Sequence, residues 1–171
     1  MTYRPRLFLD SDGVLMDFDA HYPALYGHAH KSIEEAEMWS TISKEPGFFK
    51  SMPPMPGAVD FFRQVQGLDP IILTGCPETE FYRAAREKIE SIHEHFSPTV
   101  LIVPVRGGKM KPALIQRPGD VLVDDWKKNV DLWVAHGGVG ILHTDFPSTI
   151  RKLQEIGVYP QSPITVKDII A

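Results

Sequence analysis

The chain is poor in cysteine, in long hydrophobic runs and in excess charge of either sign. Cys76 is its single cysteine, which excludes an intramolecular disulfide framework and suits a reducing compartment. No apolar run is long enough to span a bilayer, and the first residues show no apolar core of a secretory signal. The net charge of −4 disfavours a nucleic-acid backbone as a partner. We therefore expect a cytoplasmic protein that binds neither membranes nor nucleic acid polymers.

The length of 171 residues predicts about one domain, and a hydrophobic fraction of 43% is enough to give it a core. Short apolar runs alternate with helical patterns along the chain, and the runs are continuous, as in parallel strands covered on both faces. We predict strands over residues 7–10, 71–74, 100–104, 121–124 and 139–143, and helices over residues 58–65, 78–96, 127–135 and 147–156. This order predicts a doubly wound parallel α/β sheet of Rossmann-like type.

The segment 16–56 does not fit this alternation. It lies between the first strand and the first clear core helix and is rich in aromatic residues, histidine and proline. A stretch of this length is typical of a lid, a binding loop or an insertion. Ser32 and Glu35 have the spacing of a capping box, which predicts a short acidic helix over residues 32–40. We therefore divide the chain into a core of residues 1–15 and 57–171 and an insertion of residues 16–56.

Polar side chains follow three of the predicted strands. Asp10 and Asp12 follow the first strand, Thr74 ends the second, and Asp124 and Asp125 end the fourth. In open α/β sheets the crevice beyond the carboxyl ends of the strands binds ligands. Asp-x-Asp-Gly alone also occurs in calcium loops and plain turns, so the interpretation depends on the three strand ends together. Together they supply the nucleophile, the hydroxyl and the metal carboxylates of metal-assisted phosphoryl transfer.

Each of these residues has an expected role. Asp10 is the candidate nucleophile, which forms an aspartyl phosphate that water hydrolyses. Asp12 is the candidate acid and base for the leaving oxygen and for that water. Asp124 and Asp125 are adjacent carboxylates that require a cation, and oxygen ligands beside a phosphate favour Mg²⁺. The alternative for the last pair is an acidic turn at a helix N-terminus.

The phosphate-binding groups are less clearly defined by the sequence. The Thr74 hydroxyl and the amides of Gly75 and Cys76 are candidates, because a helix is expected to begin there. Three lysines are candidates for the cation, in the order Lys111, Lys109 and Lys88. Lys88 falls within the apolar stripe of the 78–96 helix, where a lysine can also extend its ammonium to solvent.

The charged residues Arg86, Glu87 and Glu90 lie in the same predicted helix as Lys88. Charges at such spacing are typical of a solvent-exposed helix face. We therefore expect all three to be solvent-exposed.

The sequence resembles the haloacid dehalogenase-like (HAD-like) phosphohydrolases and, within them, the 5′(3′)-deoxyribonucleotidase branch. The resemblance rests on Asp10-Ser-Asp-Gly-Val-Leu-Met-Asp-Phe18, on Gly47-Phe-Phe-Lys-Ser-Met-Pro-Pro-Met-Pro-Gly-Ala58 and on Val-Leu-Val-Asp-Asp125, with Asn129, Trp133 and Gly137-Gly138 downstream. It implies that residues 16–56 form a small helical cap that closes over the site and contacts the leaving group. It further implies Asp125 as the direct metal ligand with Asp124 second, and metal contacts from Asp10 and from the Asp12 carbonyl.

Four aromatic residues are candidates for stacking on a nucleobase. They are Phe18, which the resemblance supports, and Trp39, Phe48 and Phe49. The alternative is ordinary packing within the cap. Two departures from the family pattern, Trp126-Lys127-Lys128 after the aspartate pair and Gly75-Cys76-Pro77 after Thr74, concern substrate preference.

The predicted function is a Mg²⁺-dependent phosphomonoesterase of nucleoside monophosphates, with a small phosphate ester as its partner. One alternative is the same chemistry on another small phosphate ester. A receiver-type signalling module also uses Asp, Thr, Lys and Mg²⁺, but its acidic pair is early in the chain and here the pair is late. A catalytically silent phosphate- and Mg²⁺-binding protein on the same fold is the remaining alternative.

Overall fold

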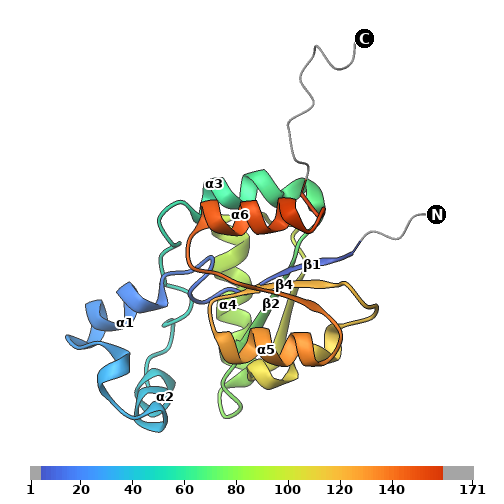
Figure 1. The fold of residues 1–171 in the computed structure, drawn as a ribbon. Helices are drawn as coiled ribbons and strands as arrows, with labels where there is room; N and C mark the ends of the chain where they lie inside the picture. The colour runs from blue at the N-terminus through green and yellow to red at the C-terminus, as the bar shows by residue number, and fades with distance from the viewer. Residues whose placement is uncertain (1–4, 160–171) are drawn as a thin grey trace, which may run out of the picture.

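The computed structural model describes residues 5–159 and places five strands in one parallel sheet (Figure 1). The strands are β1 (Leu7–Leu9), β2 (Ile71–Cys76), β3 (Ile102–Arg106), β4 (Val121–Asp124) and β5 (Val139–Leu142). Their order in the sheet is β3-β2-β1-β4-β5, and each neighbouring pair is parallel. The predicted doubly wound α/β fold is confirmed.

Helices cover both faces of the sheet. They are α3 (Ala58–Val65), the 3-10 helix η2 (Gln66–Leu68), α4 (Phe81–His95), the 3-10 helix η3 (Gly108–Leu114), α5 (Lys127–Ala135) and α6 (Phe146–Glu155). Side chains alternate along β1, so Leu7 and Leu9 join the core beneath α3, α4 and α6, whereas Phe8 packs on Trp133 of α5. Figure 1 shows α3 and α6 together on one side of the sheet and α5 on the other.

The insertion contains α1 (Phe18–Tyr26), the 3-10 helix η1 (His30–Ser32) and α2 (Glu35–Ser43), which lie beyond one end of the sheet (Figure 1). The chain enters and leaves it through two paired segments. Met55 N donates to Leu15 O at 2.8 Å, and Asp17 N donates to Pro53 O at 2.8 Å. The two crossings are thus held together at the foot of the insertion.

Several element boundaries differ from those predicted. β2 continues to Cys76 and α4 begins at Phe81, so Gly75 and Cys76 are strand residues and the prediction of a helix start there is wrong. The acidic helix is α2, three residues later than predicted. The Ser32–Glu35 capping box is absent, because Ser32 Oγ donates to Ala29 O instead. Within residues 5–159 no helix combines the length and apolar character that a membrane span requires.

Candidate active site

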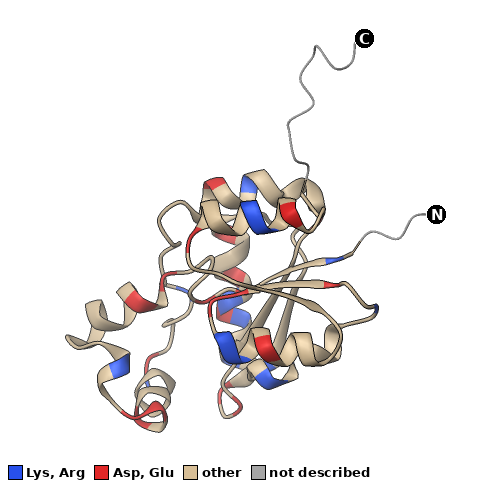
Figure 2. Ribbon diagram, in the orientation of Figure 1, with Lys and Arg blue, Asp and Glu red and all other residues tan. Residues whose placement is uncertain are grey.

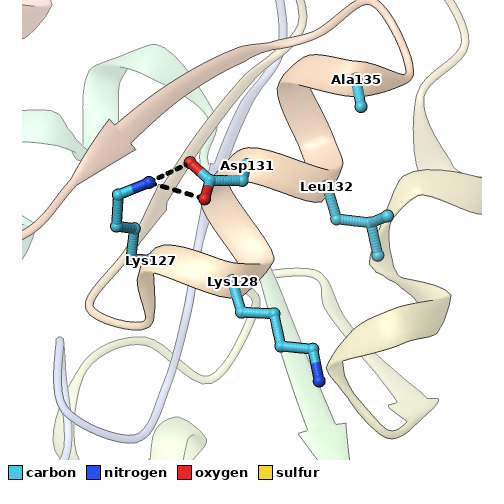
Figure 3. Close-up of a pocket in the computed structure, with 5 residues that line it drawn as sticks. All are labelled: Lys127, Lys128, Asp131, Leu132 and Ala135. Carbon is cyan, nitrogen blue, oxygen red and sulfur yellow. Dashed lines mark hydrogen bonds and ion pairs between the residues drawn. The ribbon is translucent and has the colours of Figure 1, made fainter.

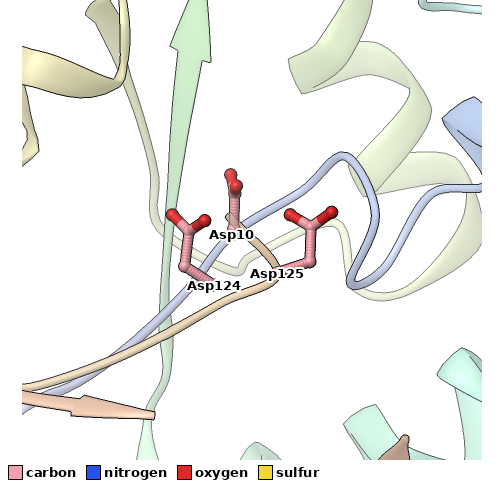
Figure 4. Close-up of side chains that lie close together, drawn as sticks. All are labelled: Asp10, Asp124 and Asp125. Carbon is pink, nitrogen blue, oxygen red and sulfur yellow. The ribbon is translucent and has the colours of Figure 1, made fainter. Parts of the chain in front are cut away.

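Three carboxylates meet where β1 and β4 end. Asp10 follows β1, Asp124 is the last residue of the neighbouring β4, and Asp125 follows it. One oxygen from each lies within 4.8 Å of the others, and Figure 4 shows the three side chains grouped on the same side of these segments. Because β1 and β4 are paired and parallel, their carboxyl ends coincide, so the grouping follows from the sheet register.

Lys111 from η3 is the cation of this cluster. Its Nζ lies 2.8 Å from Asp10 Oδ1 and 2.6 Å from Asp124 Oδ2, and the residue is only 1% exposed. Burial lowers the pKa of Lys111, but the charges of Asp10 and Asp124 outweigh it and the pKa lies above its ordinary value. The ammonium is therefore held charged between the two strand ends.

Asp10 lies in a less favourable electrostatic environment. Burial raises its pKa well above the ordinary value, and the negative charge of Asp124 raises it further. The charge of Lys111 acts in the opposite direction but does not cancel these effects. When all three carboxylates of the cluster are ionised, their negative charge exceeds what the one lysine compensates.

Asp124 is fixed by a set of donors. Besides Lys111, the Asn129 amide donates to its Oδ1 and Oδ2 at 3.2 and 3.0 Å, and Trp126 N donates to Oδ1 at 2.9 Å. Asn129 is a buried residue of α5 that was quoted in the family motif but not predicted as a site residue. Its signal in the sequence is a polar residue on the inward face of the helix that follows the aspartate pair.

Asp125 contacts the turn after β1. A Cβ on Gly13 would lie 2.1 Å from Asp125 Oδ2, and Gly13 has a φ of +75°, so only glycine fits there. Partial burial of its carboxyl, followed by the charges of Asp124 and Asp12, raises the pKa of Asp125 to about 6.

Asp12, Thr74 and Lys88 form a second group beside the first. Lys88 Nζ donates to Asp12 Oδ2 at 2.6 Å, to Gly75 O at 2.8 Å and to Thr74 Oγ1 at 3.1 Å. Lys88 is 2% exposed, so its ammonium is directed into the protein and does not extend to solvent. The other oxygen of Asp12, Oδ1, is buried and has no hydrogen-bond partner among the described residues.

The third candidate lysine lies elsewhere. Lys109 Nζ pairs with Glu78 at 2.7 Å, and both side chains are exposed. The structure therefore brings Lys111 and Lys88 to the carboxylates but gives Lys109 a surface ion pair instead.

The four candidate stacking residues gather in the insertion, where most are buried. Phe18 is 8% exposed and its ring contacts those of Tyr22, Trp39 and Phe48. Phe48 and Phe49 are also buried, and Phe49 lies beneath the Lys88 ammonium, 4.6 Å from ring centroid to Nζ. Among these four aromatic residues, Phe49 is therefore the one whose ring contacts a candidate site residue, Lys88.

Glu87 corrects one expectation drawn from the sequence. Arg86 and Glu90 are exposed on α4 as predicted, but Glu87 is buried. Its carboxylate accepts hydrogen bonds from Gly47 N at 2.9 Å and Phe49 N at 3.2 Å. The charge pattern of the helix could not reveal this contact, because the partners are backbone groups of a distant segment.

A surface hollow of about 570 Å³ lies along α5 (Figure 3). It is lined by Lys127, Lys128, Asp131, Leu132 and Ala135, none of which is a candidate site residue. Lys127 and Asp131 form an ion pair with each other at 2.6 Å. Because these two charges neutralise each other, we do not assign the hollow to the candidate active site.

The residues of the cluster fit a divalent cation that prefers oxygen ligands. The three carboxylates converge. Burial raises the pKa values of Asp10 and Asp125, the negative charges of Asp124 and Asp12 raise them further, and a metal ion would relieve that repulsion. Carboxylate oxygens are the ligands that hard divalent cations such as Mg²⁺ and Ca²⁺ prefer.

Comparison with known proteins identifies the family of this chain. Residues 4–156 match the family described as 5′ nucleotidase, deoxy (pyrimidine), cytosolic type C protein. A putative 5′(3′)-deoxyribonucleotidase of Bordetella pertussis is 28% identical over 142 residues, which cover 70% of this chain and 73% of that protein. The human 5′(3′)-deoxyribonucleotidase, cytosolic type, is 25% identical over 151 residues, covering 73% of this chain and 72% of the relative.

Solved structures show the same fold. A HAD family hydrolase from Deinococcus radiodurans, crystallised with phosphate and sodium, superposes with a TM-score of 0.56. The match covers 93% of this chain and 99% of that one at 12% sequence identity, so it supports the architecture alone.

Proposed function

Because the chain belongs to the 5′ nucleotidase, deoxy (pyrimidine), cytosolic type C family, we infer that it is a phosphoric monoester hydrolase. We propose nucleoside monophosphates as its substrates, as the names of its bacterial and human relatives suggest. The observation that carries the proposal is the convergence of Asp10, Asp124 and Asp125 within 4.8 Å, with Lys111 between Asp10 and Asp124. We expect the cytoplasm as its location, in line with the cytosolic type of the human relative.

Asp10 is the proposed nucleophile. Its carboxylate oxygen attacks the phosphorus, the bond from phosphorus to the leaving oxygen breaks, and an aspartyl phosphate forms. Asp12 gives its proton to the leaving oxygen, so the alcohol departs neutral. Asp12 then takes a proton from water, which attacks the phosphorus and releases inorganic phosphate and free Asp10.

The remaining residues bind and orient. Lys111 has two carboxylate acceptors in the described structure, which leaves one of its three N–H groups for a phosphate oxygen. Thr74 lies beside Asp12 through their shared lysine and supplies a hydroxyl at the second strand end. Asp10, Asp125, Asp124 and the Asp12 carbonyl are the proposed ligands of Mg²⁺, which when bound neutralises charge on the phosphate.

Release of inorganic phosphate from a substrate panel tests the proposal. The panel contains deoxy- and ribonucleoside monophosphates, sugar phosphates and p-nitrophenyl phosphate, each assayed with Mg²⁺ and with EDTA. We expect Mg²⁺-dependent turnover of the nucleotides that is lost in Asp10→Asn. Turnover that persists in Asp10→Asn would contradict the assigned nucleophile, and Mg²⁺ binding without any turnover would indicate a silent binding protein.

One observation favours a second candidate function, hydrolysis of another small phosphate ester by the same residues. Phe18, Phe48 and Phe49 are buried against the interior of the protein and do not present open ring faces to a base. Replacing Phe18 by leucine distinguishes the two. A nucleotidase that uses this ring loses nucleotide turnover far more than turnover of p-nitrophenyl phosphate, whereas an equal loss on both favours the other ester.

A further inference from the structure

Two adjacent residues of α4, Glu87 and Lys88, are buried with opposite charges, at 5% and 2% exposure. Successive residues on a helix are about 100° apart, so the two side chains leave the helix in different directions. Each binds a different part of the molecule. Glu87 contacts the insertion, and Lys88 contacts the strand ends.

Glu87 holds the turn of residues 47–49, which belongs to the insertion. Its two oxygens accept the N–H groups of Gly47 and Phe49 at 2.9 and 3.2 Å, and such hydrogen bonds to a carboxylate are stronger than those between neutral groups. One helical turn earlier, Arg83 Nη2 donates to Ser43 O at 2.8 Å, at the end of α2. Side chains on one face of α4 thus bind backbone groups of the insertion.

The Lys88 ammonium has no donor to spare. It carries three N–H groups, and three oxygens surround it: Asp12 Oδ2, Gly75 O and Thr74 Oγ1. The Phe49 ring also lies against it, at 4.6 Å. A phosphate oxygen could bind Lys88 only by displacing one of these acceptors. This arrangement is that of a residue that positions its neighbours and does not bind phosphate.

Phe49 connects the two residues. Its N–H is held by Glu87 and its ring lies against Lys88, so a displacement of the 47–49 turn moves the ring that covers the ammonium. A cation over an aromatic ring in a buried site is stabilised by the ring. The location of the insertion and the location of the Asp12 carboxylate are thereby linked through one side chain.

We propose that Glu87 and Lys88 are positioning residues that couple closure of the insertion to placement of Asp12. Glu87 holds the turn closed, Phe49 covers Lys88, and Lys88 fixes the Asp12 carboxylate against Thr74. The kinetic part of this proposal rests on the proposed function, since it assigns Asp12 to proton transfer. The structural part does not.

Hydrogen exchange measured by mass spectrometry tests the structural part on the full chain. In Glu87→Gln we expect faster exchange, by about tenfold, both in the 47–50 turn and in the 11–16 turn that carries Asp12. The matched control is Glu90→Gln. Glu90 lies on the same helix and also pairs with the insertion, through Lys50 at 2.9 Å, but both of those side chains are exposed. It should leave the 11–16 turn unchanged. Faster exchange in the 47–50 turn alone would show that Glu87 stabilises only that turn, and would overturn the coupling.

Turnover of p-nitrophenyl phosphate tests the kinetic part, because this small ester depends little on contacts with the insertion. We expect kcat to fall about tenfold in Glu87→Gln and in Phe49→Leu, with KM within about twofold, as for a misplaced base. p-Nitrophenolate leaves without a proton, but Asp12 is still needed to activate the water that hydrolyses the aspartyl phosphate. The kcat of the double variant should be no lower than that of the less active single variant, because both changes break the same link. Additive losses would show two independent effects and refute the coupling.

The two proposals fail in different ways. If the wild-type protein releases no phosphate from any ester, the proposed function fails while the exchange comparison still decides the coupling. If turnover is normal in Glu87→Gln and the 11–16 turn is unaffected, the coupling fails while the proposed function stands.

Discussion

Two buried lysines, Lys111 and Lys88, lie at the strand ends. They differ in the oxygen atoms that surround each ammonium, and this difference indicates different roles. Lys111 contacts two carboxylates, whereas Lys88 contacts a carboxylate, a hydroxyl and a carbonyl. An ammonium has three donors, so in the described structure Lys111 retains one for a ligand and Lys88 retains none.

Binding of inorganic phosphate should therefore distinguish the two lysines. With Mg²⁺ present, we expect Lys111→Met to weaken phosphate binding at least about tenfold, since a charge-assisted hydrogen bond is lost. Lys88→Met should change the phosphate affinity by less than about threefold, because its donors bind protein atoms. Isothermal titration calorimetry measures both without requiring activity. Equal weakening by the two variants would show that Lys88 also contacts the phosphate.

Asp125 should give the metal-free protein a distinctive pH dependence. Its pKa of about 6 in the folded state exceeds the ordinary value near 3.8, so the folded state retains a proton that the unfolded chain has released between those values. Ionisation therefore destabilises the fold as pH rises from about 4 to above 6. In EDTA at pH 8, Asp125→Asn should raise the thermal midpoint by about 2–4 °C. The gain should decrease as the pH falls through 6 and be absent near pH 4.

Excess Mg²⁺ provides the control for this prediction. A ligand that binds the folded state stabilises it, so the metal should stabilise the wild type more than Asp125→Asn and reverse their order at pH 8. A gain that is the same at pH 4 and pH 8 would show that the charge of Asp125 is not the cause.

The site residues that the sequence predicted are those at strand ends. Asp10, Thr74 and Asp124 follow apolar runs, and parallel pairing brings such ends together, so their proximity could be anticipated. Glu87 and Asn129 could not be assigned in this way, because helix residues reach the site through packing angles that the sequence pattern does not give. Lys88 was recognisable only as a charge within an apolar stripe.

At the scale of elements, the turn between β1 and α1 carries a strict steric requirement. Gly13→Ala places a methyl group 2.1 Å from Asp125 Oδ2 at a φ of +75°. We expect a loss of about 1–2 kcal/mol from the backbone strain alone. Displacement of the Asp125 carboxylate should also reduce the rise in thermal midpoint that Mg²⁺ produces.

Gly27→Ala is the matched control for this variant. Gly27 has a φ of +77° but no atom within 4 Å of the added Cβ, so it carries the strain without the clash. Its Mg²⁺-induced rise in midpoint should equal that of the wild type. If Gly13→Ala also keeps the full rise, Asp125 is not held by this turn in the metal-bound form.

Element prediction succeeded where periodicity was strong. The bounds of β4, α3 and α5 agree with those predicted, because an uninterrupted apolar run or a clear helical stripe defines them. α1 was foreseen only as part of a cap. It contains Pro23, and its buried residues are Phe18, His21 and Tyr22, so no aliphatic stripe marks it in the sequence. β3 begins two residues later than predicted, since Leu101 is exposed and precedes the paired segment.

At the scale of the whole molecule, one hydrophobic cluster joins the insertion to the core. Tyr22, Ile42 and Phe48 of the insertion belong to the same buried cluster as Leu9 and Phe61. Contacts of this kind favour unfolding as one unit. Differential scanning calorimetry in EDTA should show a single transition whose calorimetric and van't Hoff enthalpies agree. Two resolved transitions would show that the insertion unfolds separately.

The strand order has a consequence for synthesis of the chain. β1 leaves the ribosome first, yet it occupies the middle of the sheet, where Phe8 pairs with Ile71 on one side and Leu122 on the other. The nascent chain must therefore hold an apolar segment without partners until β2 and then β4 have been translated. The aromatic residues of the insertion emerge in that interval and contact one another locally. We therefore expect chaperone contact during translation to concentrate on the β1 segment.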